Sequence, residues 1–167
     1  MRFFLRIIPR LLIAATLAAG LAGARAASVK VPVKAKVIKP LVLSARQDLD
    51  FGQIIVPQSA GTRIVSISQS GVLTCGAGLI CSGVPRQAIF NVTGSNGQVA
   101  RISTATSILT NGSGGTIMFT PSAPASVTFT NSGSGGLNFG VGGSIPLTSS
   151  TSDGLYSGTV EVTVDYQ

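Results

Sequence analysis

The sequence of 167 residues has no histidine, no tryptophan and only five acidic residues. Without histidine, the chain cannot build the Ser-His-Asp or Cys-His arrangements of many hydrolases. It also has no glycine-rich dinucleotide-binding motif and no phosphate-binding loop, although it contains 21 glycines. The sequence therefore predicts no catalytic residue, no cofactor and no enzymatic activity.

Cysteine is also scarce, with only Cys75 and Cys81, in the stretch CGAGLIC. Two thiols in a chain without histidine make a poor zinc site, since structural zinc takes four Cys or His ligands. No metal ion is predicted. In an oxidising compartment, the pair is expected to form a disulfide that closes a small loop.

The first 26 residues are typical of a secretory signal peptide. A basic stretch, MRFFLRIIPR, precedes the apolar run LLIAATLAAGLAG, which is too short to span a bilayer. Ala24 and Ala26 then supply the small residues of a cleavage site, so we expect cleavage after Ala26 or Ala27. The mature protein is therefore expected to be exported.

Removal of this segment also removes most of the positive charge. With the loss of four arginines, the formal net charge falls from +7 to +3. All four lysines lie between residues 30 and 39, and the chain beyond Pro40 carries four arginines against five acids. A nucleic-acid-binding domain would carry a basic face across its fold, so no nucleic-acid partner is predicted.

Short runs of alternating apolar and polar residues recur between clusters of Gly, Asn, Ser and Pro after the signal segment. No helical period occurs, and the pattern predicts an all-β sandwich or barrel over residues 41–167. The candidate strands are residues 41–46, 49–56, 62–68, 71–75, 87–94, 98–105, 116–121, 125–131, 136–147 and 155–166. The glycine-serine run NSGSGG, residues 131–136, is expected to be a loop. The candidate core residues are Phe51, Ile54, Val56, Ile64, Ile67, Ile89, Phe90, Ile102, Phe119, Phe129 and Phe139.

Residues 27–40 form an N-terminal extension with strict alternation. In an extended chain, one side carries only apolar residues, Val29, Val31, Val33, Ala35 and Val37. Lysines occupy much of the other side, as they often do on edge strands. The pattern favours a strand with one buried face, either the first strand of this domain or a strand added to another. A basic tail on an anionic membrane would account for the lysines but not for the valines.

The C-terminal stretch GLYSGTVEVTVDYQ alternates in the same way. Val160, Val162, Val164 and Tyr166 share one side of the predicted strand, which runs to within one residue of the terminus. Chain ends usually fray, so we expect this end to be held by specific contacts.

Together, the two ends resemble those of subunits assembled by the chaperone–usher pathway. The resemblance rests on the alternating N-terminal extension, the alternating last strand, the penultimate Tyr166, and Gly154 as the fourteenth residue from the end. The resemblance implies an immunoglobulin-like β-sandwich completed by an N-terminal donor strand. It assigns the donor strand to Val29, Val31, Val33, Ala35 and Val37, and the groove- or chaperone-facing strand to Gly154, Val160, Val162, Val164 and Tyr166. The implied partners are other copies or related subunits, a periplasmic chaperone and an outer-membrane usher.

The mature chain is also similar to a family of uncharacterised bacterial secreted domains related to common-pilus subunits. The shared stretches are QDLDFGQIIVP, VGGSIPL and GLYSGTVEVTVDY. Pilin donor strands commonly carry a glycine on the groove-facing side, which is lacking here, and Pro32 removes one backbone donor.

These resemblances imply a structural or adhesive subunit of a fimbria-like filament, assembled head-to-tail by donor-strand complementation. The alternative is a monomeric exported binding or coat module in which residues 29–37 form its own first strand.

Overall fold

The computed structural model describes residues 26–58, 61–130 and 135–167. The chain divides into two units, Met1–Ala35 and Lys36–Gln167, and every strand belongs to the second. The predicted signal peptide therefore falls almost entirely outside the described residues, as does most of the NSGSGG loop. The described part of the chain contains no helix, and so none that could span a bilayer.

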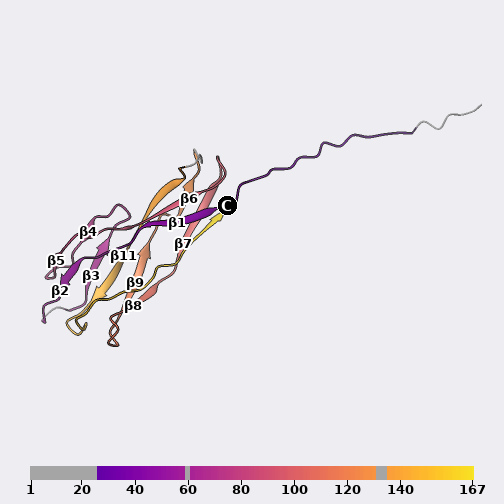
Figure 1. Ribbon diagram of the computed structural model, residues 1–167. Helices are drawn as coiled ribbons and strands as arrows, with labels where there is room; N and C mark the ends of the chain where they lie inside the picture. Colours follow the sequence, from indigo (N-terminus) through magenta and orange to yellow (C-terminus); the bar gives the residue numbers. More distant parts are fainter. Residues whose placement is uncertain (1–25, 59–60, 131–134) are drawn as a thin grey trace, which may run out of the picture. The chain divides into compact units, whose positions relative to one another are not determined.

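In the residues that the structure describes, twelve strands form an all-β domain, in antiparallel sheets that curl into a half-barrel compatible with a β-sandwich (Figure 1). The prediction of an all-β fold is confirmed. In chain order, the strands are β1 (Val42–Gln47), β2 (Gln53–Ile55), β3 (Arg63–Ile67), β4 (Leu73–Thr74), β5 (Ile80–Ser82), β6 (Ala88–Thr93), β7 (Val99–Thr104), β8 (Ser107–Thr110), β9 (Thr116–Ser122), β10 (Ser126–Thr128), β11 (Leu137–Leu147) and β12 (Val162–Tyr166).

The largest sheet has seven strands, with β1, β6, β11, β3 and β4 in order, β9 also paired to β11, and β8 paired to β9. A three-stranded sheet has the order β10-β7-β12, and β2 pairs with β5. Strand β11 is central because it pairs with β6, β3 and β9.

Two glycines allow β11 to lie close to its neighbours. A Cβ added at Gly142 would overlap the Ile67 carbonyl oxygen, and one at Gly143 would overlap the Phe119 ring. The stretch VGGSIPL therefore brings the backbone of the central strand against neighbouring core residues, which any larger side chain would prevent.

The core consists of two clusters. The first lies around β3, β9 and the second half of β11, and its buried members are Phe51, Val65, Ile67, Leu79, Ile117, Phe119, Ile145 and Leu147. The second lies around β6, β7 and the first half of β11, and contains Ala88, Val92, Ala100, Ile102, Phe129, Phe139 and Val141. Strand β12 packs against the second cluster through Val162, Val164 and Tyr166.

Most of the predicted core residues are buried or half-buried, but the prediction for Ile64 is wrong. Its side chain is 58% exposed, whereas Val65 and Ile67 on the same strand are 0% and 1% exposed. Side chains alternate along a strand, so Ile64 and Ile67 cannot share a face. The pairing of β3 with β11 turns Val65 and Ile67 inward.

The predicted strand 49–56 is also shorter in the structure, where only β2 is a strand. Strands β5 and β8 were not predicted. Both are short, and their sequences ICS and SILT give too few residues for a period to stand out.

Replacing Ile67 with alanine is expected to lower the free energy of unfolding by about 2–5 kcal/mol, because it removes a fully buried side chain. Ile64→Ala, three residues away on the solvent face of β3, is the matched control and should change stability by less than about 1 kcal/mol. Urea denaturation of both variants measures the difference. Equal losses of stability in the two variants would contradict the burial of Ile67 and the exposure of Ile64.

Candidate functional site

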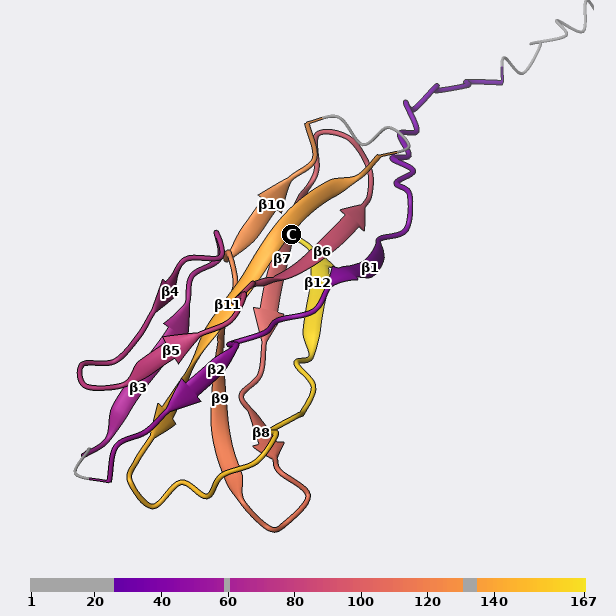
Figure 2. The ribbon, with the colours of Figure 1, turned by 60° about the vertical axis from the view of Figure 1, so that its left-hand side comes forward.

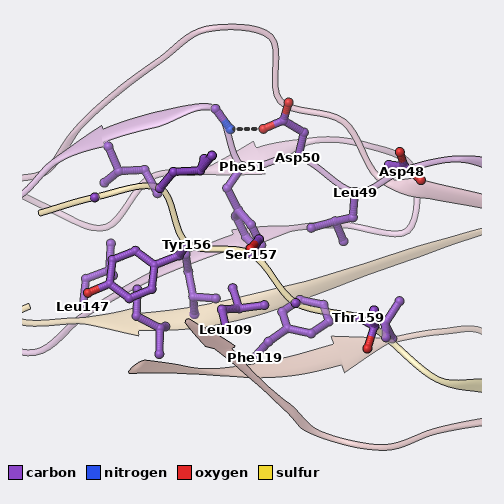
Figure 3. Close-up of a pocket in the computed structure, with 18 of the residues that line it drawn as sticks. Asp48, Leu49, Asp50, Phe51, Leu109, Phe119, Leu147, Tyr156, Ser157 and Thr159 are labelled. Carbon is purple, nitrogen blue, oxygen red and sulfur yellow. Dashed lines mark hydrogen bonds between the residues drawn. The ribbon is translucent and has the colours of Figure 1, made fainter. Parts of the chain in front are cut away.

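A groove of about 900 Å³ opens between two segments, one from near the start and one from near the end of the domain's sequence (Figure 3). One wall is residues 45–56, which run from the end of β1 through β2. The other is residues 151–160, which lead into β12. This volume lies within the range of ligand-binding clefts, and both walls are long enough to flank an extended segment.

The floor of the groove is apolar. It is formed from strands β8, β9 and β11 by Leu109, Ile117, Phe119, Ile145 and Leu147. From the first wall, Phe51 packs edge-on against Phe119, with the ring centroids 6.1 Å apart. The rim is partly apolar too, since Ile55 is 58% exposed and Leu155 is 86% exposed. Exposed apolar side chains around an apolar hollow are typical of a surface that another segment covers.

Each wall adjoins a strand with a free backbone edge. In the described part of the chain, β1 pairs with β6 and β12 pairs with β7, and neither has a second partner. An unpaired edge presents N–H and C=O groups that can accept an added strand. Figure 2 shows β1 and β12 side by side near the C-terminus.

The penultimate residue, Tyr166, joins the two edge strands at this end. Its hydroxyl donates to the Lys39 carbonyl oxygen, at 2.8 Å, and accepts from the Ser95 backbone N–H, at 2.7 Å. Its ring lies 6.2 Å from that of Phe129, in an edge arrangement. The bond to Lys39 ties β12 to the residues just before β1, so the C-terminal strand is held and one end of the opening is closed.

The wall formed by residues 151–160 is held mostly by loop contacts. Asn111 donates through Nδ2 to the Ser152 hydroxyl and to the Asp153 carbonyl, at 3.2 and 3.1 Å. Thr110 and Ser157 exchange two backbone hydrogen bonds of 2.9 Å. Gly154 adopts a φ of +137° beside the Asn111 side chain, in a region that larger residues rarely enter. The glycine near the end of the chain thus lets this wall bend past Asn111.

Three carboxylates lie along the groove, Asp48 and Asp50 on the first wall and Asp153 on the second. Asp50 is already engaged, because it accepts from the Gly52 backbone N–H at 2.8 Å and lies 3.9 Å from the Arg86 guanidinium. Among the residues that the structure describes, no group of three or more His, Cys, Asp and Glu could hold a metal ion.

These carboxylates alternate with apolar side chains along the first wall. Figure 3 shows Leu49 and Phe51 on the inner side of this segment, and Asp50 bonded at the turn that follows. Phe51 is buried and Leu49 half-buried, whereas Asp48 and Asp50 are exposed. The carboxylates of the first wall are therefore exposed, whereas Leu49 and Phe51 face the apolar interior of the groove.

The disulfide forms as predicted, between Cys75 and Cys81. It closes the loop between β4 and β5, and both cysteines pack against the first core cluster.

The family of the chain follows from a match to a known family model over almost the whole β-domain. A family match described as "Domain of unknown function (DUF4402)" covers residues 41–166. The chain belongs to the DUF4402 family. No curated protein and no solved structure matches the chain.

The DUF4402 domain brings together only some of the residues assigned to the groove-facing strand. Gly154 and Val160 line the groove. Val162, Val164 and Tyr166 lie further along β12 and pack against the second core cluster, with Leu41 and Leu43 of the first strand region. The alternation predicted for the last strand is present, since these three side chains are half-buried and Thr163 and Asp165 are exposed.

The N-terminal extension precedes the DUF4402 domain. Residues 26–40 contain no strand, and all of them are exposed. Val29, Val31, Val33 and Val37 are between 74% and 94% exposed. The structure thus shows no strand in this segment, and these four valine side chains are exposed.

The role of Asn111 in holding the second wall was not predicted from the sequence. Its side chain also accepts from the backbone N–H groups of Ser113 and Gly115 at the β8–β9 turn. An Asn-Gly pair is a turn signal, but a contact with residues some forty positions later has no local pattern.

Replacing Tyr166 with phenylalanine is expected to lower the free energy of unfolding by about 1–3 kcal/mol, because it leaves the Lys39 carbonyl and the Ser95 N–H without their partner. Tyr156→Phe is the matched control. Its hydroxyl bonds only within the loop, to Ser152, so a loss under about 1 kcal/mol is expected. Chemical denaturation compares the two, and equal effects would show that Tyr166 does not join the two edge strands.

Proposed function

We propose that this protein is a structural or adhesive subunit of a bacterial surface filament, assembled head-to-tail by donor-strand complementation. The observation that carries the proposal is the open apolar groove, whose two walls each adjoin a strand with a free backbone edge. Residues 29–37 of one copy would enter the groove of the next. Strand addition to an exposed edge is a general mode of peptide recognition.

The length and the apolar face of the extension suit this assignment. Nine residues in a strand extend about 30 Å, the length of a long sheet strand. Val29, Val31 and Val33 are exposed in the extension, and each valine that becomes fully buried would contribute about 1.5–3 kcal/mol. Pro32 would face the mouth of the groove, where its missing N–H removes only one ladder bond.

The contact would be heterologous, because the extension and the groove are different surfaces of the same chain. Such contacts generate open filaments unless the rotation between copies closes a ring. The signal peptide supports export, and so passage through the periplasm to the cell surface. An exposed groove is prone to aggregation on the way, which is why we also propose a periplasmic chaperone and an outer-membrane usher as partners.

Assembly can be tested with the mature chain, residues 27–167. We expect it to form oligomers whose size increases with concentration in analytical ultracentrifugation. Val31→Ser with Val33→Ser should abolish assembly, because it removes the apolar face of the extension but leaves the groove intact. Pro32→Ala, on the opposite side of the same segment, is the matched control and should assemble.

The groove is tested separately with Leu155→Asp, which puts a charge on an exposed rim residue and should block entry of a strand. Val72→Asp is the control, since Val72 is 63% exposed and does not line the groove. A mixture of Leu155→Asp with the V31S/V33S chain should give one-to-one heterodimers, as each supplies the part that the other lacks.

If the mature chain is instead a monomer whose 28–38 amides resist hydrogen exchange, residues 29–37 form its own strand and the filament proposal fails.

A further inference from the structure

Opposite charges are separated between the extension and the groove. All four lysines of the chain lie between residues 30 and 39, and three of its five acids line the groove. The other two acids, Glu161 and Asp165, follow the second wall without lining the groove. The segment proposed to enter is therefore basic, and the mouth that it would enter is acidic.

Two of the groove carboxylates are available to a partner. Asp50 is engaged by Gly52 and Arg86. Asp48 and Asp153 are both exposed, and neither side chain forms an ion pair or hydrogen bond with another described residue. Asp48 belongs to the first wall and Asp153 to the second, so each wall offers one carboxylate to an entering strand.

We propose that Asp48 and Asp153 recognise the lysines of an incoming extension from a second copy of this chain. The inference rests on the proposed function, because it takes the groove as the site that the extension enters. With Val29, Val31 and Val33 facing the floor, Lys30, Lys34 and Lys36 point away from the floor, toward the solvent to which Asp48 and Asp153 are exposed. The charges thus favour an extension of this chain over a neutral or acidic strand with the same apolar pattern.

These pairs act mainly on the rate of association. Solvent-exposed ion pairs add little to affinity, and the apolar face of the strand supplies most of the binding. Complementary charge around a cleft raises the rate of encounter by about 10-fold or more, and salt screens this effect. Charge therefore governs how fast, and with which partner, the groove is filled, whereas the valines determine how long it stays filled.

The experiment uses the full mature chain with V31S and V33S as the acceptor, so that its own charge is unchanged and it does not assemble. The probe is a synthetic peptide of residues 28–38, compared with the same peptide carrying K30Q, K34Q and K36Q. Association and dissociation rates are measured at about 20 mM and about 500 mM NaCl, on either side of effective screening. The acceptor is then compared with its D48N/D153N form and, as a control with the same change in charge, its E161Q/D165N form.

We expect the neutral peptide to associate about 10-fold more slowly than the basic peptide at low salt and equally fast at high salt. With the basic peptide, the D48N/D153N acceptor should also associate about 10-fold more slowly at low salt. The neutral peptide with the D48N/D153N acceptor should show no further loss of rate. The E161Q/D165N acceptor should stay within about 2-fold of the parent acceptor. All these positions are exposed, so unchanged melting temperatures verify folding.

Two results would overturn the inference and leave the proposed function standing. In the first, both peptides bind at the same rate with the same dependence on salt. In the second, E161Q/D165N slows association as much as D48N/D153N does, because the effect then comes from net charge and not from the groove mouth. If neither peptide binds at either salt concentration, the proposed function fails and the inference fails with it.

Discussion

The hydroxyl of Tyr166 fixes the relation between the two ends of the domain. By bonding to the Lys39 carbonyl and the Ser95 N–H, it ties the last strand to the chain just before the first. From that junction, the two edge segments separate toward residues 45–56 and 151–160, and the groove lies between them. This side chain joins the two ends of the domain at one end of the open side, while β1 and β12 are each held by pairing with one neighbour, β6 and β7.

The opening has a cost that the fold reduces in several ways. Unpaired strand edges above an apolar floor promote association with other chains. Here the second wall is held by Asn111 and by the Thr110–Ser157 pair, and exposed carboxylates line the groove. Charge at an exposed edge discourages random pairing with other strands.

Much of the fold could be predicted from the sequence, since alternation and turn residues are local signals. The all-β class, ten of the strand regions, the disulfide and the alternation of β12 all follow from short stretches. Ile64 shows the limit of this reasoning, because a strand has two faces and only its pairing with β11 decides which is buried. The groove itself depends on contacts between segments far apart in the sequence, such as Phe51 with Phe119 and Tyr166 with Lys39. No local pattern encodes those distances.

The disulfide between Cys75 and Cys81 spans six residues, whereas the ladder around β11 joins residues as distant as Ile67 and Gly143. Closing a short loop costs little chain entropy, and long-range sheet pairing is the slow part of β-protein folding. The disulfide therefore requires only that residues 75–81 adopt their local turn. It can close before the residues of the central strand are available to pair.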